Sequence, residues 1–212
     1  MPPRLGRRGF FITLEGGDGS GKSTHTVRLV AWLRAQGHAV QVTREPGGTR
    51  LGERVRRNLL EAPTLSPWAE LLLFQALRAQ HVAEVIKPAL ARGRVVVCDR
   101  YSDSTMAYQG YGLGLDRATI TGLTRFVTRE AVPDLTILLD TPPTAGLRRA
   151  RVRRTMERRG LAFQRRVRAG FLAIAREDPR RCRIVTVQPT SVATQTLIRQ
   201  VVSDALQRRR RP

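Results

Sequence analysis

The feature that most constrains this chain is a glycine-rich segment at residues 16–23, GGDGSGKS, which matches the pattern G-x-x-x-x-G-K-[ST]. An apolar run of β-forming residues precedes it, and a helical pattern follows from residue 23. Glycines let the backbone turn so that successive N–H groups point inward, and together with the helix N-terminus these donors attract an anion. The segment therefore predicts a site for a nucleoside triphosphate. Its expected contacts are Gly16, Gly17, Asp18, Gly19, Ser20, Gly21, Lys22, Ser23 and Thr24.

Three polar side chains have expected roles at the triphosphate. Lys22 should reach the β- and γ-phosphates as a catalytic cation, and the Ser23 hydroxyl should bind Mg²⁺. Asp99 follows the apolar run VVVC at residues 95–98, as the carboxylate of a Walker B pattern does, and is expected to hold the same ion directly or through water. A helix cap is the alternative role for Asp99. The expected cofactor is Mg²⁺, bound together with the triphosphate.

Hydrophobic patterning indicates a single α/β domain over residues 1–212. Five runs rich in β-forming residues are expected as strands, and several are apolar throughout, which is typical of a parallel sheet buried on both faces. The expected strands are residues 10–15, 39–44, 94–99, 135–140 and 183–187. Helical patterns alternate with them at residues 23–36, 51–60, 67–92, 117–130, 144–154, 161–176 and 193–208. The alternation predicts a P-loop NTPase fold, a five-stranded parallel sheet with helices on both faces.

The chain ends, apolar runs and cysteines limit the cellular setting. No apolar run approaches the roughly 20 residues that cross a bilayer, and the apolar stretch near the N-terminus is too short for a signal peptide. Cys98 and Cys182 make no disulfide framework, and Cys98 is expected to be a buried thiol at the end of an apolar run. Residues 1–8 and 208–212 are expected to be disordered tails. The expected location is the cytoplasm, with no membrane partner.

The net charge of +21 raises the question of nucleic-acid binding. Only Lys22 and Lys87 are lysines, so 36 of the 38 basic residues are arginine, and the arginines are spread along the chain. Such a skew is typical of compositional drift, and no dedicated nucleic-acid partner is expected. A basic nucleic-acid-binding protein that uses the glycine-rich loop only as a switch stays open as the non-enzymatic alternative.

Two arginines follow other predicted strands. Arg44 ends the second and Arg100 directly follows the third. Ligands of open parallel sheets bind beyond the carboxyl ends of the strands, so both guanidinium groups are expected in the same cleft as Lys22. Guanidinium groups match phosphate oxygens, so the pair indicates a second phosphate beside the triphosphate. Surface salt bridges are the alternative role for these arginines.

Several longer motifs go beyond the glycine-rich loop. They read TREPGGT at residues 43–49, ELLLFQALR at 70–78, IKPAL at 86–90, DRYSDSTMAYQG at 99–110 and PDLTILLD at 133–140. In combination they resemble bacterial thymidylate kinases, which belong to the P-loop nucleoside monophosphate kinases. The similarity covers residues 10–140 and is weaker at residues 165–171. It implies transfer of the γ-phosphate of ATP to dTMP, giving ADP and dTDP, by an enzyme that is commonly a homodimer.

The resemblance also implies residue roles. Phe74 matches the ring that stacks on thymine, and Arg78, four residues later on one helix, matches the residue that meets a base carbonyl. Gln109 matches the amide that reads the ring N–H, and Tyr108 matches the ring that packs under the sugar. The implied dTMP contacts are Asp18, Arg44, Phe74, Arg78, Arg100, Ser104, Thr105, Tyr108 and Gln109. Arg100 is also expected to be catalytic. Ordinary core packing is the alternative role for Phe74.

The match departs from the family in the expected lid, at about residues 148–164. In the family a short mobile lid closes over ATP and normally supplies a catalytic arginine when glycine follows the acid of the loop, as it does in Asp18-Gly19. Here the segment is short and poor in acids, and Arg158 is the nearest counterpart of that arginine, with Arg153 and Arg154 as competitors. Arg148 matches a position near the adenine. The altered lid keeps open a paralogous kinase that acts on another pyrimidine monophosphate.

Overall fold

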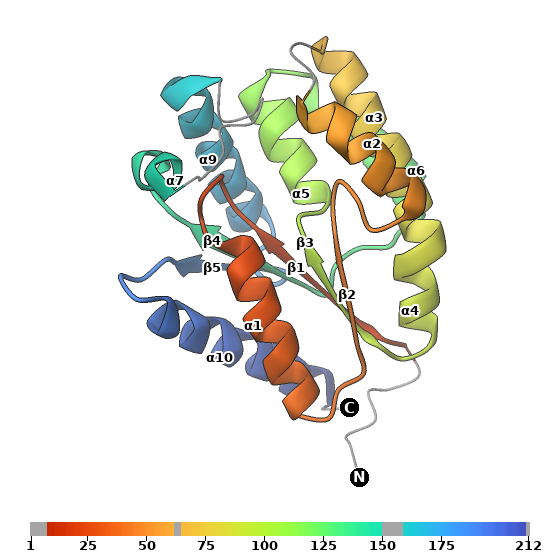
Figure 1. The fold of residues 1–212 in the computed structure, drawn as a ribbon, viewed down its shortest axis with the longest axis vertical. Coiled ribbons are helices and arrows are strands. Elements are labelled where there is room, and N and C mark those ends of the chain that lie inside the picture. The colour runs from red at the N-terminus through yellow and green to blue at the C-terminus, as the bar shows by residue number, and fades with distance from the viewer. Residues whose placement is uncertain (1–7, 62–64, 150–158, 211–212) are drawn as a thin grey trace.

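The computed structural model describes residues 8–61, 65–149 and 159–210, and Figure 1 shows a central sheet with helices on both sides. In this part of the chain the sheet has five strands, all parallel, in the order β2-β3-β1-β4-β5. The strands are β1 Phe10–Glu15, β2 Val40–Arg44, β3 Val95–Asp99, β4 Leu135–Asp140 and β5 Cys182–Thr186. The predicted fold class is confirmed, and each strand end lies within one residue of its predicted position.

Helices connect the strands. They are α1 Lys22–Ala35, α2 Arg50–Glu61, α3 Pro67–His81, α4 Lys87–Ala91, α5 Ser102–Thr105, α6 Arg117–Thr128, α7 Pro143–Arg149, α9 Gly160–Glu177 and α10 Ser191–Arg210. Two π-helical segments continue shorter helices: η1 Val82–Ile86 joins α3 to α4, and η2 Met106–Gly112 extends α5. The helix expected over residues 67–92 is therefore one continuous helical rod.

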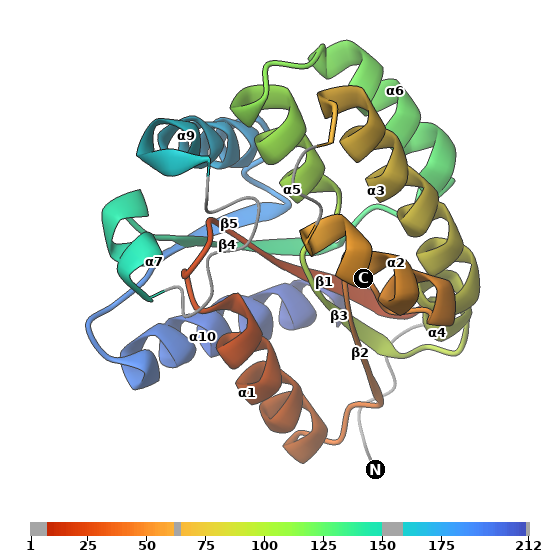
Figure 2. The same ribbon diagram turned by 45° about the horizontal axis from the view of Figure 1, so that its top comes forward.

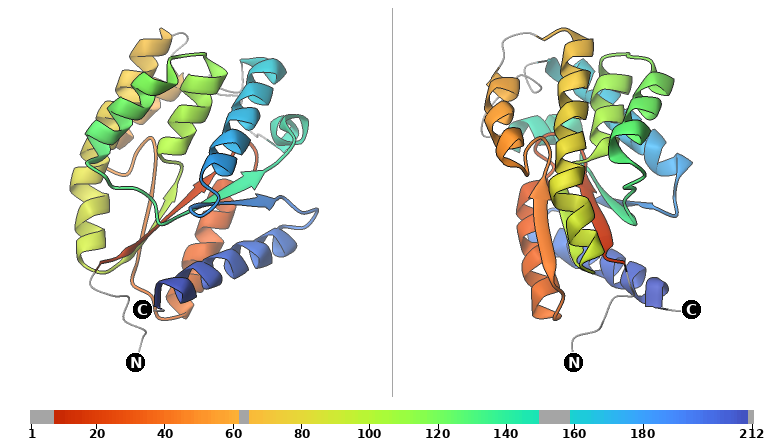
Figure 3. Two further views of the ribbon diagram at one scale, coloured as in Figure 1. Left: turned by 180° about the vertical axis from the view of Figure 1, so that it is seen from behind. Right: turned by 90° about the vertical axis from the view of Figure 1, so that its right-hand side faces the viewer.

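One face of the sheet is covered by α1 and α10, which lie side by side in Figures 1 and 3. Leu29 and Leu33 of α1 and Ile198 and Val202 of α10 are fully buried, and they pack with Ile12 of β1. Burial of such side chains contributes about 1.5–3 kcal/mol each. This layer holds α1 in place, so the start of α1 stays fixed directly beyond β1.

The opposite face of the sheet, away from α1 and α10, is covered by a second layer of helices. Figure 2 shows α9, α5 and the pair of α3 and α6 in a row above the strands. Phe11 and Val96 pack with Ile86 of η1, while Leu138 packs with Phe171 of α9. Because successive residues of a strand point to opposite faces, Phe11 packs against this layer, whereas its neighbour Ile12 packs against α1 and α10. The strands are therefore apolar on both sides, as their sequence indicated.

The carboxyl ends of three strands meet at one edge of the sheet. In the parallel register, Asp99 of β3 lies beside Leu14 of β1 and beside Arg44 of β2. The glycine-rich loop follows β1, and Arg100 follows β3. This alignment brings the predicted phosphate-binding residues of separate motifs to one place.

One helical element was not expected from the sequence. Residues 102–112, which begin inside the motif DRYSDSTMAYQG and end two residues beyond it, form α5 and η2. Gly112 lies against the Phe163 ring, where a Cβ would come within 2.7 Å of the ring. Close packing on α9 therefore explains a glycine that helix propensity alone disfavours.

The C-terminal tail begins later than expected. Helix α10 continues to Arg210, whereas the sequence suggested a disordered tail from Arg208. Arg209 donates to the carbonyl oxygens of Gly9 at 2.8 Å and Arg8 at 2.7 Å, and pairs with Asp134 at 3.6 Å. These contacts order the end of the helix and correct the expected boundary.

Two smaller findings complete the description of the fold: the burial of Cys98 and the character of the helices. Cys98 is buried, as predicted, and burial raises the pKa of its thiol well above the usual value. Among the described residues, no helix is long and apolar enough to span a membrane.

Candidate active site

The glycine-rich loop lies between β1 and α1 and curls against α7. Gly19 has a φ of +71°, and a Cβ there would lie 2.0 Å from the carbonyl oxygen of Gly146. Only glycine fits that position without moving the backbone of α7. The expected contacts from Gly16 to Ser23 thus form one tight turn at the N-terminus of α1, the geometry that binds anions.

Lys22 is folded into this turn. Its Nζ donates to the carbonyl oxygens of Gly16 at 2.9 Å and Gly17 at 2.7 Å, and to Ser20 Oγ at 3.2 Å. Burial, and next the positive charge of Arg100, lower the pKa of Lys22 to about 8. An anion beside the ammonium group opposes both causes, so phosphate oxygens are a favourable partner for it.

Ser23 and Asp99 meet across the loop. Ser23 Oγ donates to Asp99 Oδ2 at 2.6 Å, which brings together a hydroxyl and a carboxylate oxygen beside the triphosphate loop. Mg²⁺ prefers oxygen ligands and commonly takes only one or two from the protein, with the rest from phosphates and water. The pair fits such an ion, and the described residues contain no cluster of three or more His, Cys, Asp or Glu side chains suited to a metal.

Arg100 reaches back to the loop from the end of β3. Its Nη1 donates to Gly16 O at 3.1 Å, and its Nη2 donates to Asp18 Oδ1 at 2.5 Å and to the Tyr108 hydroxyl at 3.2 Å. Burial opposes ionisation of Asp18, but the positive charges of Arg100 and Lys22 outweigh it and lower the pKa of Asp18. Arg100 also has a φ of +70°, a strained backbone conformation of the kind that clusters at functional sites.

Arg44 faces the same space from the neighbouring strand. A cavity of about 730 Å³ is lined by Lys22, Arg44 and Arg100, and also by Ser23 and Asp99. Arg44 pairs with Glu53 at 2.7 Å, and both side chains are about half exposed, so the pair is weakly held. The expected convergence of two arginines on the glycine-rich loop is therefore observed. Thr24 lines this cavity too.

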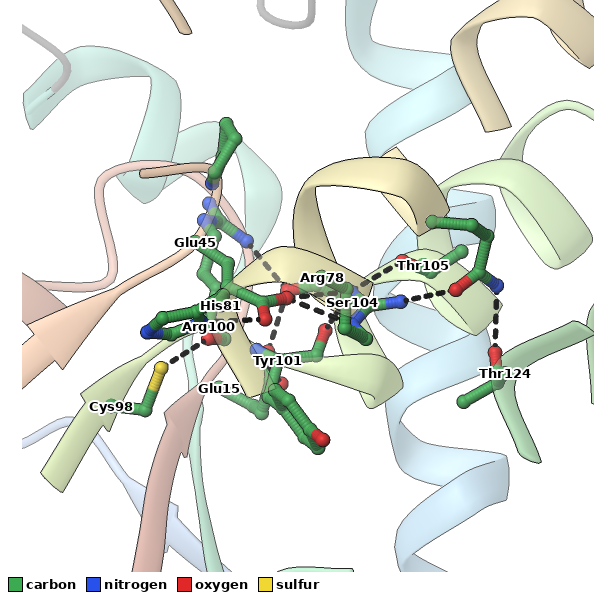
Figure 4. A network of polar contacts seen from close by, with 12 residues as sticks. Glu15, Glu45, Arg78, His81, Cys98, Arg100, Tyr101, Ser104, Thr105 and Thr124 are labelled. Carbon is green, nitrogen blue, oxygen red and sulfur yellow. Dashed lines mark hydrogen bonds and ion pairs between the residues drawn. The ribbon is translucent and has the colours of Figure 1, made fainter. Parts of the chain in front are cut away.

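Arg78 is buried in a polar network on the other side of Arg100, drawn in Figure 4. Its Nε donates to Glu45 Oε2 at 2.8 Å, its Nη1 to Gln75 Oε1 at 3.1 Å, and its Nη2 to Tyr101 O at 3.1 Å and Thr105 Oγ1 at 2.9 Å. These bonds use four of the five guanidinium N–H groups. One Nη1–H group takes part in none of these four bonds, so it is the group through which Arg78 can donate one further hydrogen bond.

His81 extends this network by one step. It is fully buried, with Nδ1 2.9 Å from Glu45 Oε1 and Nε2 2.6 Å from Thr43 Oγ1. Glu45 therefore bridges Arg78 and His81, and it ties the TREPGGT loop to α3, as Figure 4 shows. The bridging fixes the orientation of Arg78.

Four further residues expected at the base and sugar lie around the same region. Phe74 is half-buried, and the three clusters of buried apolar residues found among the described residues do not include it. Tyr108 is buried, with the rings of Phe163 and Phe171 each 6.1 Å from its own. Thr105 and Gln109 are buried, and Gln109 donates its Nε2–H to Glu70 at 2.7 Å. The place of Phe74 outside these clusters weighs against core packing, which was the alternative role for this residue.

Glu15, the last residue of β1, connects the two halves of the site. Its carboxylate accepts from the Tyr101 N–H at 2.7 Å and from Ser104 Oγ at 2.5 Å. Burial, and next the negative charge of Asp103, raise the pKa of Glu15 to about 7. Ser104 also accepts from Arg100 Nη1 at 3.2 Å, so Glu15 orients the segment that carries Arg100.

Most of the expected lid, at about residues 148–164, lies outside the described residues. The part outside is residues 150–158, which include Arg153 and Arg158, and the chain ends 1–7 and 211–212 lie outside as well. Arg148 is exposed at the end of α7. The roles of these residues stay predictions from the sequence.

Sequence reasoning missed several residues of the network. Glu15, Glu45, Glu70 and His81 have no individual signal in the motif patterns, although Glu45 lies inside TREPGGT. Spacing gives one usable hint, because His81 follows Arg78 by three residues and so shares its helix face. Charged and polar residues on the buried face of a helix are the pattern to look for.

Comparisons with known proteins agree with this geometry. The family model described as "Thymidylate kinase" matches residues 14–198. A thymidylate kinase of a Synechococcus strain is 52% identical over 185 residues, covering 86% of this chain and 90% of that protein. A thymidylate kinase of Thermomicrobium roseum is 49% identical over 201 residues, covering 93% and 92%.

Among solved structures, the crystal structure of thymidylate kinase from Ehrlichia chaffeensis is similar with a TM-score of 0.79 and 36% sequence identity. The match covers 92% of this chain and 98% of that one. A cavity lined by Lys22, Arg44 and Arg100, a family model over most of the chain and relatives at about half identity agree with one another. The chain belongs to the thymidylate kinase family.

Proposed function

We propose that this protein transfers the γ-phosphate of ATP to dTMP and releases ADP and dTDP. The observation that carries the proposal is the cavity of about 730 Å³ in which Lys22, Arg44 and Arg100 converge from three strand ends. Three cations around one cleft suit two neighbouring phosphate groups, whose mutual repulsion has to be screened before they react.

The donor half is the turn at the start of α1. Backbone N–H groups of the loop and Lys22 hold the β- and γ-phosphates, and Ser23 with Asp99 holds Mg²⁺. The ion would neutralise charge on the phosphates when it is bound. Lys22 then exchanges its carbonyl partners in the loop for phosphate oxygens, which suit a buried ammonium group better.

The acceptor half is built around Arg44 and Arg100, which bind the phosphate of dTMP. Asp18 contacts the sugar 3′-hydroxyl, and Tyr108 packs under the sugar. Glu53 and Asp18 compete with the phosphate for these guanidinium groups, so the arginines are oriented while they remain exchangeable. The donor and acceptor phosphates thereby face each other along one line.

Base recognition uses the network below the cleft. Phe74 stacks on thymine, the remaining Nη1 hydrogen of Arg78 meets a base carbonyl, and Gln109 accepts the ring N–H. Ser104 and Thr105 flank these contacts. Because the other donors of Arg78 are fixed by Glu45 and its neighbours, the guanidinium presents one direction of hydrogen bonding to the base.

The reaction needs no general base from the protein. A phosphate oxygen of dTMP is already an anionic nucleophile, so the residues supply charge screening, alignment and exclusion of water. A lid arginine completes the screening, and the sequence puts Arg158 first and Arg153 second for that role.

Two further parts of the proposal concern assembly and location. Apolar side chains are exposed on α3 and α6, at Trp68, Leu72, Leu73 and Phe126. Helices α3 and α6 pack against each other, and a second copy of the chain covering this surface would bury it, giving a homodimer. Sedimentation at micromolar concentration tests this, with monomer alone contradicting it. The cytoplasm, where ATP is supplied, is the proposed location.

An acceptor panel tests the function directly. ADP release is measured with ATP and Mg²⁺ against dTMP, dUMP, dCMP, UMP and CMP, with Lys22→Met as the matched inactive control. The highest kcat/KM is expected for dTMP. A higher kcat/KM for another monophosphate would move the protein to a paralogous activity, and release that persists in Lys22→Met would expose a contaminant.

A further inference from the structure

Glu70 and Gln109 form a buried pair next to the proposed base site. Glu70 lies in the first turn of α3 and Gln109 in η2, and each residue is 2% exposed. Gln109 Nε2 donates to Glu70 Oε1 at 2.7 Å. Figure 2 shows α3 and α5, the helix that η2 extends, on the same side of the sheet.

The chemistry of this pair fixes which way the amide points. A carboxylate only accepts hydrogen bonds, so the NH₂ end of Gln109 has to face Glu70. The carbonyl oxygen of the same amide is then turned to the opposite side. An amide without such a neighbour presents either end, because its two ends have nearly the same shape.

Arg159 holds Glu70 from the far side. Its Nη2 lies 2.6 Å from Glu70 Oε2 and its Nη1 3.3 Å from Glu70 Oε1, and its guanidinium carbon lies 5.2 Å from the centre of the Phe163 ring. This two-point contact fixes the plane of the carboxylate and neutralises its buried charge. Arg159 directly precedes α9, so the contact joins the start of that helix to α3.

We propose that Glu70, held by Arg159, is a specificity-determining residue that selects thymine and uracil against cytosine through Gln109. This inference rests on the proposed function and on Gln109 facing the base. The fixed carbonyl oxygen accepts the N3–H of thymine or uracil. Cytosine has an unprotonated N3 with a lone pair, so it meets that oxygen with repulsion.

Accepting cytosine would require the Gln109 amide to rotate by half a turn. The rotated amide presents its NH₂ group to cytosine N3, but its oxygen then faces the carboxylate of Glu70. Two buried acceptors in contact, with no donor between them, are strongly disfavoured. Glu70 therefore prevents the Gln109 amide from rotating, so that Gln109 cannot adapt to cytosine as well as to thymine.

The test is Glu70→Gln, which keeps the shape but lets residue 70 either donate or accept. The preference for dTMP over dCMP, as a ratio of kcat/KM, is expected to fall by about tenfold or more, mainly because kcat/KM for dCMP rises. The preference for dTMP over dUMP should stay within about twofold, since the two bases differ only by a methyl group away from N3. This dUMP comparison separates base selection from a general loss of activity.

A second variant guards against misfolding. Glu70→Gln with Arg159→Gln removes both charges, so it leaves no unpaired ion in the core, and it should show the same fall in the dTMP-to-dCMP ratio. Arg165→Gln is the matched control on an exposed position of α9 and should leave both ratios unchanged. Circular dichroism and thermal unfolding confirm that each variant is folded.

Two outcomes would overturn the proposal. In one, folded Glu70→Gln and the double variant keep the wild-type dTMP-to-dCMP ratio. In the other, kcat/KM falls equally for dTMP, dUMP and dCMP, which indicates a merely structural role. Failure of the proposed function shows differently, because the wild-type protein itself would then not prefer dTMP.

Discussion

Arg100 and Asp18 form an ion pair, with Arg100 Nη2 2.5 Å from Asp18 Oδ1, that joins the end of β3 to the phosphate-binding loop. Arg100 Nη1 also bonds to Gly16 O in the same loop. The guanidinium therefore lies at the junction of the proposed ATP and dTMP sites. Arg100 and Asp18 belong to two different motifs and lie 82 positions apart in the sequence.

Replacing Arg100 should separate acceptor binding from donor binding. Arg100→Ala is expected to lower kcat/KM for dTMP by about 10²–10³-fold, because a preorganised cation is lost where phosphate charge develops. The KM for ATP should change only a few-fold. Steady-state kinetics with each substrate varied in turn measure both, and Arg125→Ala, on an exposed position of α6, is the control. A larger effect on ATP than on dTMP would contradict the assignment.

The proposed mechanism takes one catalytic arginine from the lid. Arg158→Ala is expected to lower kcat by roughly 10³-fold and to leave ATP affinity nearly unchanged, as for arginine fingers in other phosphoryl transfer enzymes. Single-turnover kinetics and ATP titration measure the two quantities, and Arg153→Ala is the paired variant. If kcat of Arg158→Ala stays within a few-fold of wild type while Arg153→Ala loses activity, Arg153 takes the role.

The two glutamate–arginine pairs at the TREPGGT loop should differ in stability. Glu45→Ala leaves Arg78 buried without its partner, so it is expected to lower the free energy of unfolding by about 3–5 kcal/mol. Glu53→Ala removes the partner of the half-exposed Arg44 and should cost about 0–1 kcal/mol. Urea unfolding compares the variants, and equal losses would show that the Arg78 network is not a stabilising one.

Glu15 predicts a pH dependence of stability with a defined sign. Its pKa is raised to about 7 in the folded protein, so protonation of Glu15 favours folding. That contribution is complete below the unfolded pKa of about 4.5 and is lost as the pH rises through 7. Wild type should therefore lose up to roughly 3 kcal/mol relative to Glu15→Gln between pH 5 and about 8.

Thermal or urea unfolding of both proteins across this pH range measures the difference. Other groups titrate in both proteins, so their contributions cancel, and Glu130→Gln, in the exposed turn after α6, controls for loss of one negative charge. A constant difference between wild type and Glu15→Gln would show that Glu15 ionises without a folding penalty.

The sequence by itself determined the parts of this protein that depend on local backbone chemistry. The glycine pattern from Gly16 to Lys22 indicates a tight turn, and side chains at Gly16 and Gly19 would collide with the backbone around them. The apolar strands require a parallel sheet buried on both faces. Once the strands are parallel, Arg44 and Asp99 have to meet at one edge.

Tertiary structure decided which polar groups pair inside the site. Glu70 meets Arg159 across 89 positions and Gln109 across 39, and Arg78 meets Glu45 across 33. Such contacts depend on how α3, η2 and α9 pack over the sheet, and no local pattern specifies that packing. The proposed phosphate site was predictable because it is built largely from consecutive backbone groups, whereas the proposed base site depends on contacts between side chains that only the folded chain brings together.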